Sequence, residues 1–215
     1  MPRLRLLFLL ALFPVMVAGA QLGLRAAGME YCLTQLTMSV YYALVVMGLC
    51  LLMGYAGQVS LGHGAFFALG GYTTAVLTTH DFSGIRACAG VGVLERAGLL
   101  VAQQDLYGQA GLSVAPWAAF AAAMLLTFVV ALLIGYPALR LRGHYLAMAT
   151  LGFTLIVSKL LLGSALTGSA DGIHGVPEWK LLPGLTVSGR SALRVQNYYL
   201  ACGLALLLLL GLRNL

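Results

Sequence analysis

The sequence predicts an all-α fold: a polytopic integral membrane protein with about six transmembrane helices and a glycine-rich broken-helix segment. Of its 215 residues, 61% are hydrophobic and only 8% are charged, whereas soluble domains contain about 25% charged residues. A membrane span needs about 20 apolar residues, so the length allows about six spans with their loops. The net charge of +6 does not indicate a nucleic-acid partner, because the basic residues are scattered and lie beside apolar runs.

Six apolar runs are the expected spans of a single transmembrane domain over residues 1–215. They cover residues 6–24, 31–53, 64–79, 114–139, 145–162 and 197–212. The first run has two interpretations. It follows two arginines and contains Ala18-Gly19-Ala20, which is typical of a secretory signal peptide. We favour an uncleaved span, because another membrane segment follows directly.

Two long polar stretches, residues 80–113 and 166–196, are expected to be extracytoplasmic loops. With the N-terminus in the cytoplasm and six spans, the basic residues at span ends fall inside and all six acidic residues fall outside; the inner ones are Arg3, Arg5, Arg140, Arg142 and Arg213. The positive-inside rule favours this orientation, with both termini cytoplasmic. Residues 97–102 are apolar but too short to span, and suggest a surface helix.

Metal and disulfide sites are not indicated by the four cysteines, whose spacing fits neither. Cys32, Cys50 and Cys202 lie in or beside apolar runs and are expected to act as small hydrophobic residues, while Cys88 is alone in the first loop. We therefore expect no metal site.

The central feature of the chain is a glycine-rich segment, residues 54–74, with six glycines in its first eighteen residues. Residues 54–62 predict a break between two helices, and transporters place substrate sites at such breaks. The structural alternative is a loop followed by a tightly packed helix that contacts no ligand. A helical face of small residues follows at spacings of four, three and four, and predicts close helix packing; it consists of Gly64, Ala68, Gly71 and Ala75.

Polar but uncharged groups around this break predict a path for a neutral or zwitterionic solute with an aliphatic part. The candidate path residues are Gly57, Gln58, Ser60, His63, Phe66, Phe67 and Tyr72. His63 is expected either to bond backbone groups freed by the break or to line the path. The spans contain few charges, which does not favour a proton relay or an ion pump. The sequence shows no catalytic constellation and no ATP-binding motif, so we expect a protein that is not an enzyme and binds no cofactor.

Three strings in the chain carry a family resemblance. They are GYAGQVSLGHGAFFALGGYTTAVL from residue 54, LRLRGHYLAMATL from residue 139, and LTGSADGI from residue 166. They resemble the LivM/LivH family of permease subunits of branched-chain amino acid ABC importers, in particular its LivM branch. The resemblance implies a multi-pass protein of the bacterial inner membrane that carries leucine, isoleucine and valine.

The resemblance also implies partners. These are a second permease subunit in a heterodimer, two cytoplasmic ATP-binding subunits that use the ATP, and a periplasmic substrate-binding protein. Asp171, Glu178 and Lys180 are the expected contacts of the binding protein, although residues 167–172 also read as an ordinary turn. The alternatives are a permease for urea or short amides of the same family, or a non-transporting anchor or assembly partner. Members of the family are usually longer and continue into an ATPase-coupling segment, so we expect this chain to be the N-terminal part of a permease.

Overall fold

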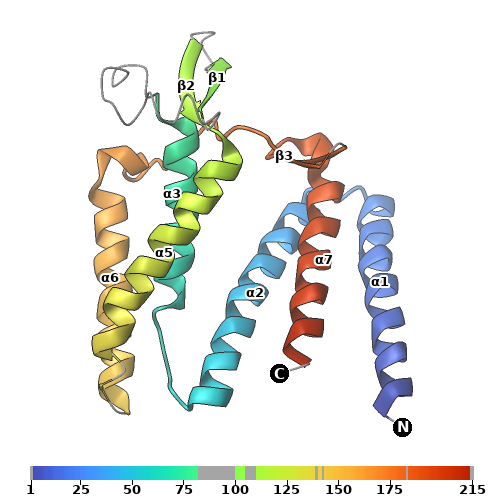
Figure 1. Cartoon of the computed structure of the whole chain (residues 1–215). Coiled ribbons are helices and arrows are strands. Elements are labelled where there is room, and N and C mark those ends of the chain that lie inside the picture. Colours follow the sequence, from blue (N-terminus) through green and yellow to red (C-terminus); the bar gives the residue numbers. More distant parts are fainter. Residues whose placement is uncertain are drawn as a thin grey trace. The chain divides into compact units, whose positions relative to one another are not determined.

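The computed structural model describes residues 2–81, 100–104, 110–138, 140–141, 143–182 and 184–213 (Figure 1). The chain divides into two compact units, one of Met1–Gly48 with Glu178–Leu215 and the other of Leu49–Pro177. Cys88 and most of the expected loop over residues 80–113 lie outside the described residues.

Each of the six expected spans coincides with a helix. The helices are α1 (Pro2–Ala26), α2 (Cys32–Ala56), α3 (His63–Thr79), α5 (Pro116–Ala138), α6 (His144–Gly163) and α7 (Arg194–Arg213). Among the described residues, four segments are long and apolar enough to cross a membrane: α2, α5, α6 and Ser191–Leu212. Helix α3 has 17 residues, or about 25 Å, which is shorter than the usual hydrocarbon thickness. The mostly helical, polytopic fold predicted from the sequence is confirmed.

Two antiparallel hairpins lie within the polar stretches. Strand β1 (Leu100–Gln104) pairs with β2 (Ala110–Val114), and β3 (Trp179–Leu182) pairs with β4 (Leu185–Val187). The surface helix expected at residues 97–102 is therefore wrong for Leu100–Ala102, which are part of β1. An isolated helix of six residues is unstable in water, whereas pairing with β2 satisfies the backbone groups of this segment.

The first unit has its core where α1, α2 and α7 meet. Val17, Leu33, Tyr198 and Cys202 form this core, and Leu33 is only 1% exposed. The Tyr199 hydroxyl donates a hydrogen bond of 2.5 Å to the Gln21 side-chain oxygen, so the amide oxygen carried by α1 has a partner on α7. Helix α1 is thus packed into this unit, and the uncleaved span stays a prediction.

The second unit is built from α3, α5, α6 and the β1–β2 hairpin, with α3 beside both α5 and α6 (Figure 1). Small residues allow the close approach of these helices: Ala65 on α3 and Ala119 on α5 are 2% and 0% exposed. The hairpin is tied to the end of α3, because the Leu112 amide donates to the Asp81 carboxylate at 3.0 Å. This packing positions the segment that precedes α3.

Candidate functional site

The break between α2 and α3 consists of residues 57–62 and is shorter than the predicted 54–62, because α2 continues to Ala56. Gly57 ends α2 with a φ of 61°, a left-handed conformation that glycine adopts at the least cost. Its amide donates to the Met53 carbonyl at 3.1 Å. The glycine signal in the sequence therefore locates the start of the break.

The backbone of Leu61 is held by two threonines of α6. The Leu61 amide donates to Thr150 Oγ1 at 3.0 Å, and Thr154 Oγ1 donates to the Leu61 carbonyl at 2.8 Å. Both polar groups of one residue in the break are thus satisfied by neighbouring turns of one helix, as a segment in hydrocarbon requires. Thr150 is six residues from the start of α6, or about 9 Å along its axis, so Leu61 lies well within the length of that helix.

Further contacts lie within the break and between α6 and the break or the start of α3. The Gly62 amide donates to Ser60 Oγ at 3.3 Å, and Ser60 is 8% exposed. A Cβ placed on Gly62 would lie 3.5 Å from Thr150 Cβ and 3.7 Å from the Phe153 ring. The Phe66 and Phe153 rings have centroids 5.2 Å apart. Residues 150, 153 and 154 lie on one face of α6, and the break packs against this face.

The structure does not gather the seven candidate path residues at one place. Phe66 packs on Phe153 of α6, whereas the neighbouring Phe67 is 48% exposed, so the two phenylalanines do not face one path. Gln58 is half-buried, and its side chain makes no hydrogen bond within the described residues. Tyr72 lies two turns into α3, away from the break.

His63 was expected to bond freed backbone groups or to line the path. Its Nδ1 atom is buried and has no hydrogen-bond partner among the described residues. The side chains that bond the freed backbone groups of the break belong to Ser60, Thr150 and Thr154. His63 Nδ1 therefore does not bond the freed backbone groups of the break.

The two glycines of the small-residue face of α3 are not in close contact with other helices of its unit. Gly64 and Gly71 are exposed, and a Cβ on either would meet nothing within 4 Å. Contacts with α5 and α6 come instead from the other side of the helix, where a Cβ on Gly70 would lie 3.7 Å from Thr127 Oγ1 of α5. Close helix packing on the face of Gly64, Ala68, Gly71 and Ala75 stays a prediction.

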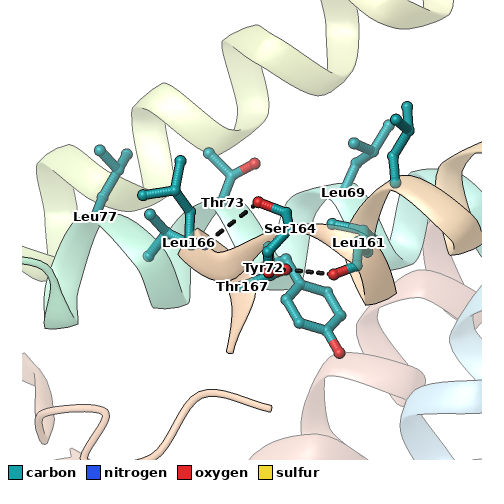
Figure 2. Close-up of a pocket in the computed structure, with 10 residues that line it drawn as sticks. Leu69, Tyr72, Thr73, Leu77, Leu161, Ser164, Leu166 and Thr167 are labelled. Carbon is teal, nitrogen blue, oxygen red and sulfur yellow. Dashed lines mark hydrogen bonds between the residues drawn. The ribbon is translucent and has the colours of Figure 1, made fainter. Parts of the chain in front are cut away.

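A pocket of about 430 Å³ lies between α3, the end of α6 and the short 3-10 helix η2 (Ala165–Thr167) (Figure 2). Its lining comprises six aliphatic residues and four with hydroxyl groups, and includes no charged residue: Leu69, Tyr72, Thr73, Val76, Leu77, Leu160, Leu161, Ser164, Leu166 and Thr167. The Thr167 hydroxyl donates to the Leu161 carbonyl, and Ser164 Oγ accepts from the Leu166 amide at 3.3 Å. The Thr167 hydroxyl thus bonds the last turn of α6 and the Ser164 hydroxyl caps the start of η2, and the remaining surface suits an uncharged aliphatic group.

The three residues expected to dock a binding protein have different surroundings. Asp171 is exposed and belongs to the second unit. Glu178 is half-buried and paired with Arg190 at 2.8 Å, and it also accepts from the Ser188 hydroxyl at 3.4 Å. Lys180 is exposed on β3, opposite Thr186 of β4. Of the two first-unit residues, Lys180 is the more accessible to a partner.

Thr150 and Thr154 were missed by reasoning from the sequence. Thr150 lies in the second of the three quoted strings and bonds Leu61 in the first, 89 residues away. The available signal was weak: two threonines four residues apart in an apolar run, which most often bond only their own helix. The structure shows that these two also bond the break.

Comparison with known proteins places the chain in a family. Residues 31–213, which include the break and α6, match the family described as "Branched-chain amino acid transport system / permease component". Over 173 residues the chain is 33% identical to the high-affinity branched-chain amino acid transport system permease protein LivM of Salmonella typhimurium, an alignment that covers 80% of this chain and 32% of that protein. Over 143 residues it is 34% identical to the LivM protein of Escherichia coli K12, with 66% and 26% covered.

The chain thus spans about a third or less of the length of these two relatives. No solved structure shows a significant match to it. The family match covers most of the chain and extends over helices α2 to α7. The chain belongs to the family of permease components of branched-chain amino acid transport systems.

Proposed function

We propose that this chain forms part of the permease subunit of an ABC importer that moves leucine, isoleucine and valine across the bacterial inner membrane. The observation that carries the proposal is the uncharged break between α2 and α3, whose Leu61 backbone is bonded to α6 at both its amide and its carbonyl. Irregular backbone at membrane depth persists where it is buried in protein or lines an aqueous cavity. In transporters, such breaks lie at the substrate site.

The substrate class follows from the chemistry of the break. Residues 57–73 contain no Asp, Glu, Lys or Arg, so a bound solute would meet uncharged hydrogen-bonding groups and apolar surface. Gln58 is half-buried and makes no hydrogen bond within the described residues, which leaves its amide able to bind a polar group of a passing solute. A branched-chain amino acid has such a polar end and an aliphatic side chain. The names of the two LivM relatives support this assignment.

The energy source and the partners belong to the same proposal. The permease itself binds no cofactor, and two cytoplasmic ATP-binding subunits hydrolyse ATP. A second permease subunit completes the path, and a periplasmic protein delivers the substrate. Asp171, Glu178 and Lys180 stay the predicted contacts of the binding protein, and of the two in the first unit Lys180 is exposed. Both termini of the chain lie in the cytoplasm.

The test is radiolabelled leucine uptake into proteoliposomes that hold the permease with its second subunit, the ATP-binding subunits and the binding protein. Uptake should require both ATP and the binding protein. Gln58→Leu removes one polar contact with the solute and should slow uptake roughly fivefold to tenfold, as expected for one lost hydrogen bond. Val59→Leu, an apolar exchange at the next residue, is the matched control and should leave uptake unchanged.

Three outcomes would contradict parts of the proposal. Wild-type uptake by Gln58→Leu, at equal incorporation, would remove Gln58 from the path. Uptake of urea or a short amide in place of leucine would overturn the substrate assignment and leave the permease role intact. A chain that co-purifies with no ATP-binding subunit and supports no flux would identify a membrane anchor or assembly partner instead.

A further inference from the structure

We propose that Thr150 and Thr154 are positioning residues that fix the break to α6, so that the break moves with this helix when the permease opens and closes. The transport part of this inference rests on the function proposed above, whereas its structural part does not. The evidence is one juxtaposition: two hydroxyls on neighbouring turns of α6 bond the amide and the carbonyl of the same residue, Leu61.

The Thr150 hydroxyl is itself held in place by its own helix, whereas the single proton of the Thr154 hydroxyl is shared between the Leu61 and Thr150 carbonyls. Thr150 Oγ1 lies 3.0 Å from the carbonyls of Leu146 and Ala147, and Thr154 Oγ1 lies 3.0 Å from the Thr150 carbonyl. A hydroxyl that donates to a carbonyl of the preceding turn still has lone pairs that can accept. Thr150 can therefore donate within α6 and accept from Leu61 at the same time. Its branched Cβ restricts its rotamers and keeps the hydroxyl on this face.

The break is attached differently at its two ends. At Leu61 and Gly62 it is bonded to and packed against α6. At Gly57 the structure gives one backbone bond, to Met53 of α2, and a φ of 61°; glycine adopts positive and negative φ about equally readily. A displacement of α6 would therefore carry Leu61 along and be absorbed near Gly57.

Two apolar side chains of the break are accessible. Val59 and Leu61 are 48% and 47% exposed, although the backbone of Leu61 is bonded to α6. The backbone is thus fixed while these side chains remain accessible. The accessibility of residue 59 is therefore a direct measure of where the break lies.

The structural test uses Val59→Cys as the only cysteine, with the four native cysteines replaced by alanine, in the assembled transporter. The measured quantity is the rate of modification by a water-soluble maleimide. Thr150→Val and Thr154→Val keep the side-chain shape and remove the hydroxyl. Each should change the modification rate roughly fivefold to tenfold, as expected when one hydrogen bond is lost.

Two controls separate positioning from general damage. Thr150→Ser and Thr154→Ser keep the hydroxyl and should restore the parental rate. Thr127→Val removes a hydroxyl that donates to its own helix, at the Ala123 carbonyl of α5, and should leave the rate unchanged. If Thr150→Val fails to assemble, Thr154→Val gives the same comparison with the bond of the Leu61 amide intact.

The functional test measures leucine transported per ATP hydrolysed. If the break is positioned by α6, the valine variants should hydrolyse ATP at near-parental rates and transport several-fold less leucine, and the serine variants should recover the parental ratio. Parental modification rates in both valine variants would overturn the inference. An absence of leucine transport in the parent would count against the proposed function alone, because the maleimide experiment needs no transport.

Discussion

Gly168 lies in a tight turn that leaves no room for a Cβ atom. Its φ is 74°, and a Cβ built on it would overlap the backbone carbonyl of Gly172. The Asp171 and Gly172 amides both donate to the Gly168 carbonyl, at 3.1 and 3.2 Å. Gly168→Ala should therefore lower the free energy of unfolding by more than about 2 kcal/mol, the sum of left-handed strain and a backbone displacement. Thermal unfolding of the detergent-solubilised protein measures this.

The matched control for this prediction is Gly172→Ala in the same turn. Gly172 has the same φ of 74°, but a Cβ there would meet nothing within 4 Å. Its replacement should cost only the left-handed strain, about 1–2 kcal/mol. Equal destabilisation by the two alanine variants would show that the overlap at Gly168 is relieved at no cost.

Single residues also show where sequence reasoning succeeds and where it stops. The break at Gly57 was predictable because a glycine-rich interruption of an apolar run is a local signal. The partners of the break were not, because Thr150 and Thr154 lie 89 and 93 residues from Leu61. The sequence shows that backbone groups in a membrane need partners. Which residues supply them depends on how α6 packs.

The two adjacent glycines of helix α3 have different surroundings. Gly70 approaches Thr127 of α5, whereas Gly71 is exposed and a Cβ there would meet nothing. Gly70→Leu should force α3 and α5 apart and destabilise the unit by about 1–3 kcal/mol. Gly71→Leu should leave this stability within about 0.5 kcal/mol.

The measurement is again thermal unfolding of the purified chain, with co-purification of the second permease subunit as a separate readout. If the small-residue face packs against another helix, Gly71→Leu should reduce co-purification while stability is unchanged. Unfolding of Gly71→Leu at a clearly lower temperature than Gly70→Leu would contradict the assignment of faces.

The hairpins are the elements that the sequence did not predict. Strand β1 has the sequence Leu-Val-Ala-Gln-Gln, and β3 has Trp-Lys-Leu-Leu. Neither alternates apolar and polar residues regularly, so the period-two signal of a strand is missing. The β1–β2 hairpin also depends on a bond between the Leu112 amide and Asp81, 31 residues away, which periodicity cannot reveal. Helices were predictable because long apolar runs carry a stronger signal.

For the whole molecule, the helical fold could be predicted from composition because each membrane span must be a long apolar segment. Four described segments meet the length and apolarity of a membrane span, and the expected bounds of all six spans differ from those of the helices by a few residues. Contacts between helices could not be predicted from composition. Tyr199 and Gln21 are 178 residues apart, and only the packed structure shows that they are bonded.

We predict an orientation in the membrane with both termini of the molecule in the cytoplasm. An even number of spans places both termini on one side, and arginines at span ends favour the cytoplasm for that side. Leu141→Cys, between α5 and α6, should then react only from the inside, and Met29→Cys, between α1 and α2, only from the outside. Leu141 and Met29 are 37% and 40% exposed, so each cysteine is accessible.

The experiment compares a membrane-impermeant maleimide on intact cells and on inverted vesicles, with the native cysteines replaced by alanine. Ser191→Cys, at an exposed position in the short helix η3 (Ser191–Leu193) before α7, should react from the outside like Met29→Cys. Reaction of Leu141→Cys in intact cells would reverse the orientation. Opposite sidedness of Met29→Cys and Ser191→Cys would instead contradict the count of spans, because in the proposed topology four spans separate these two positions and return the chain to the same side.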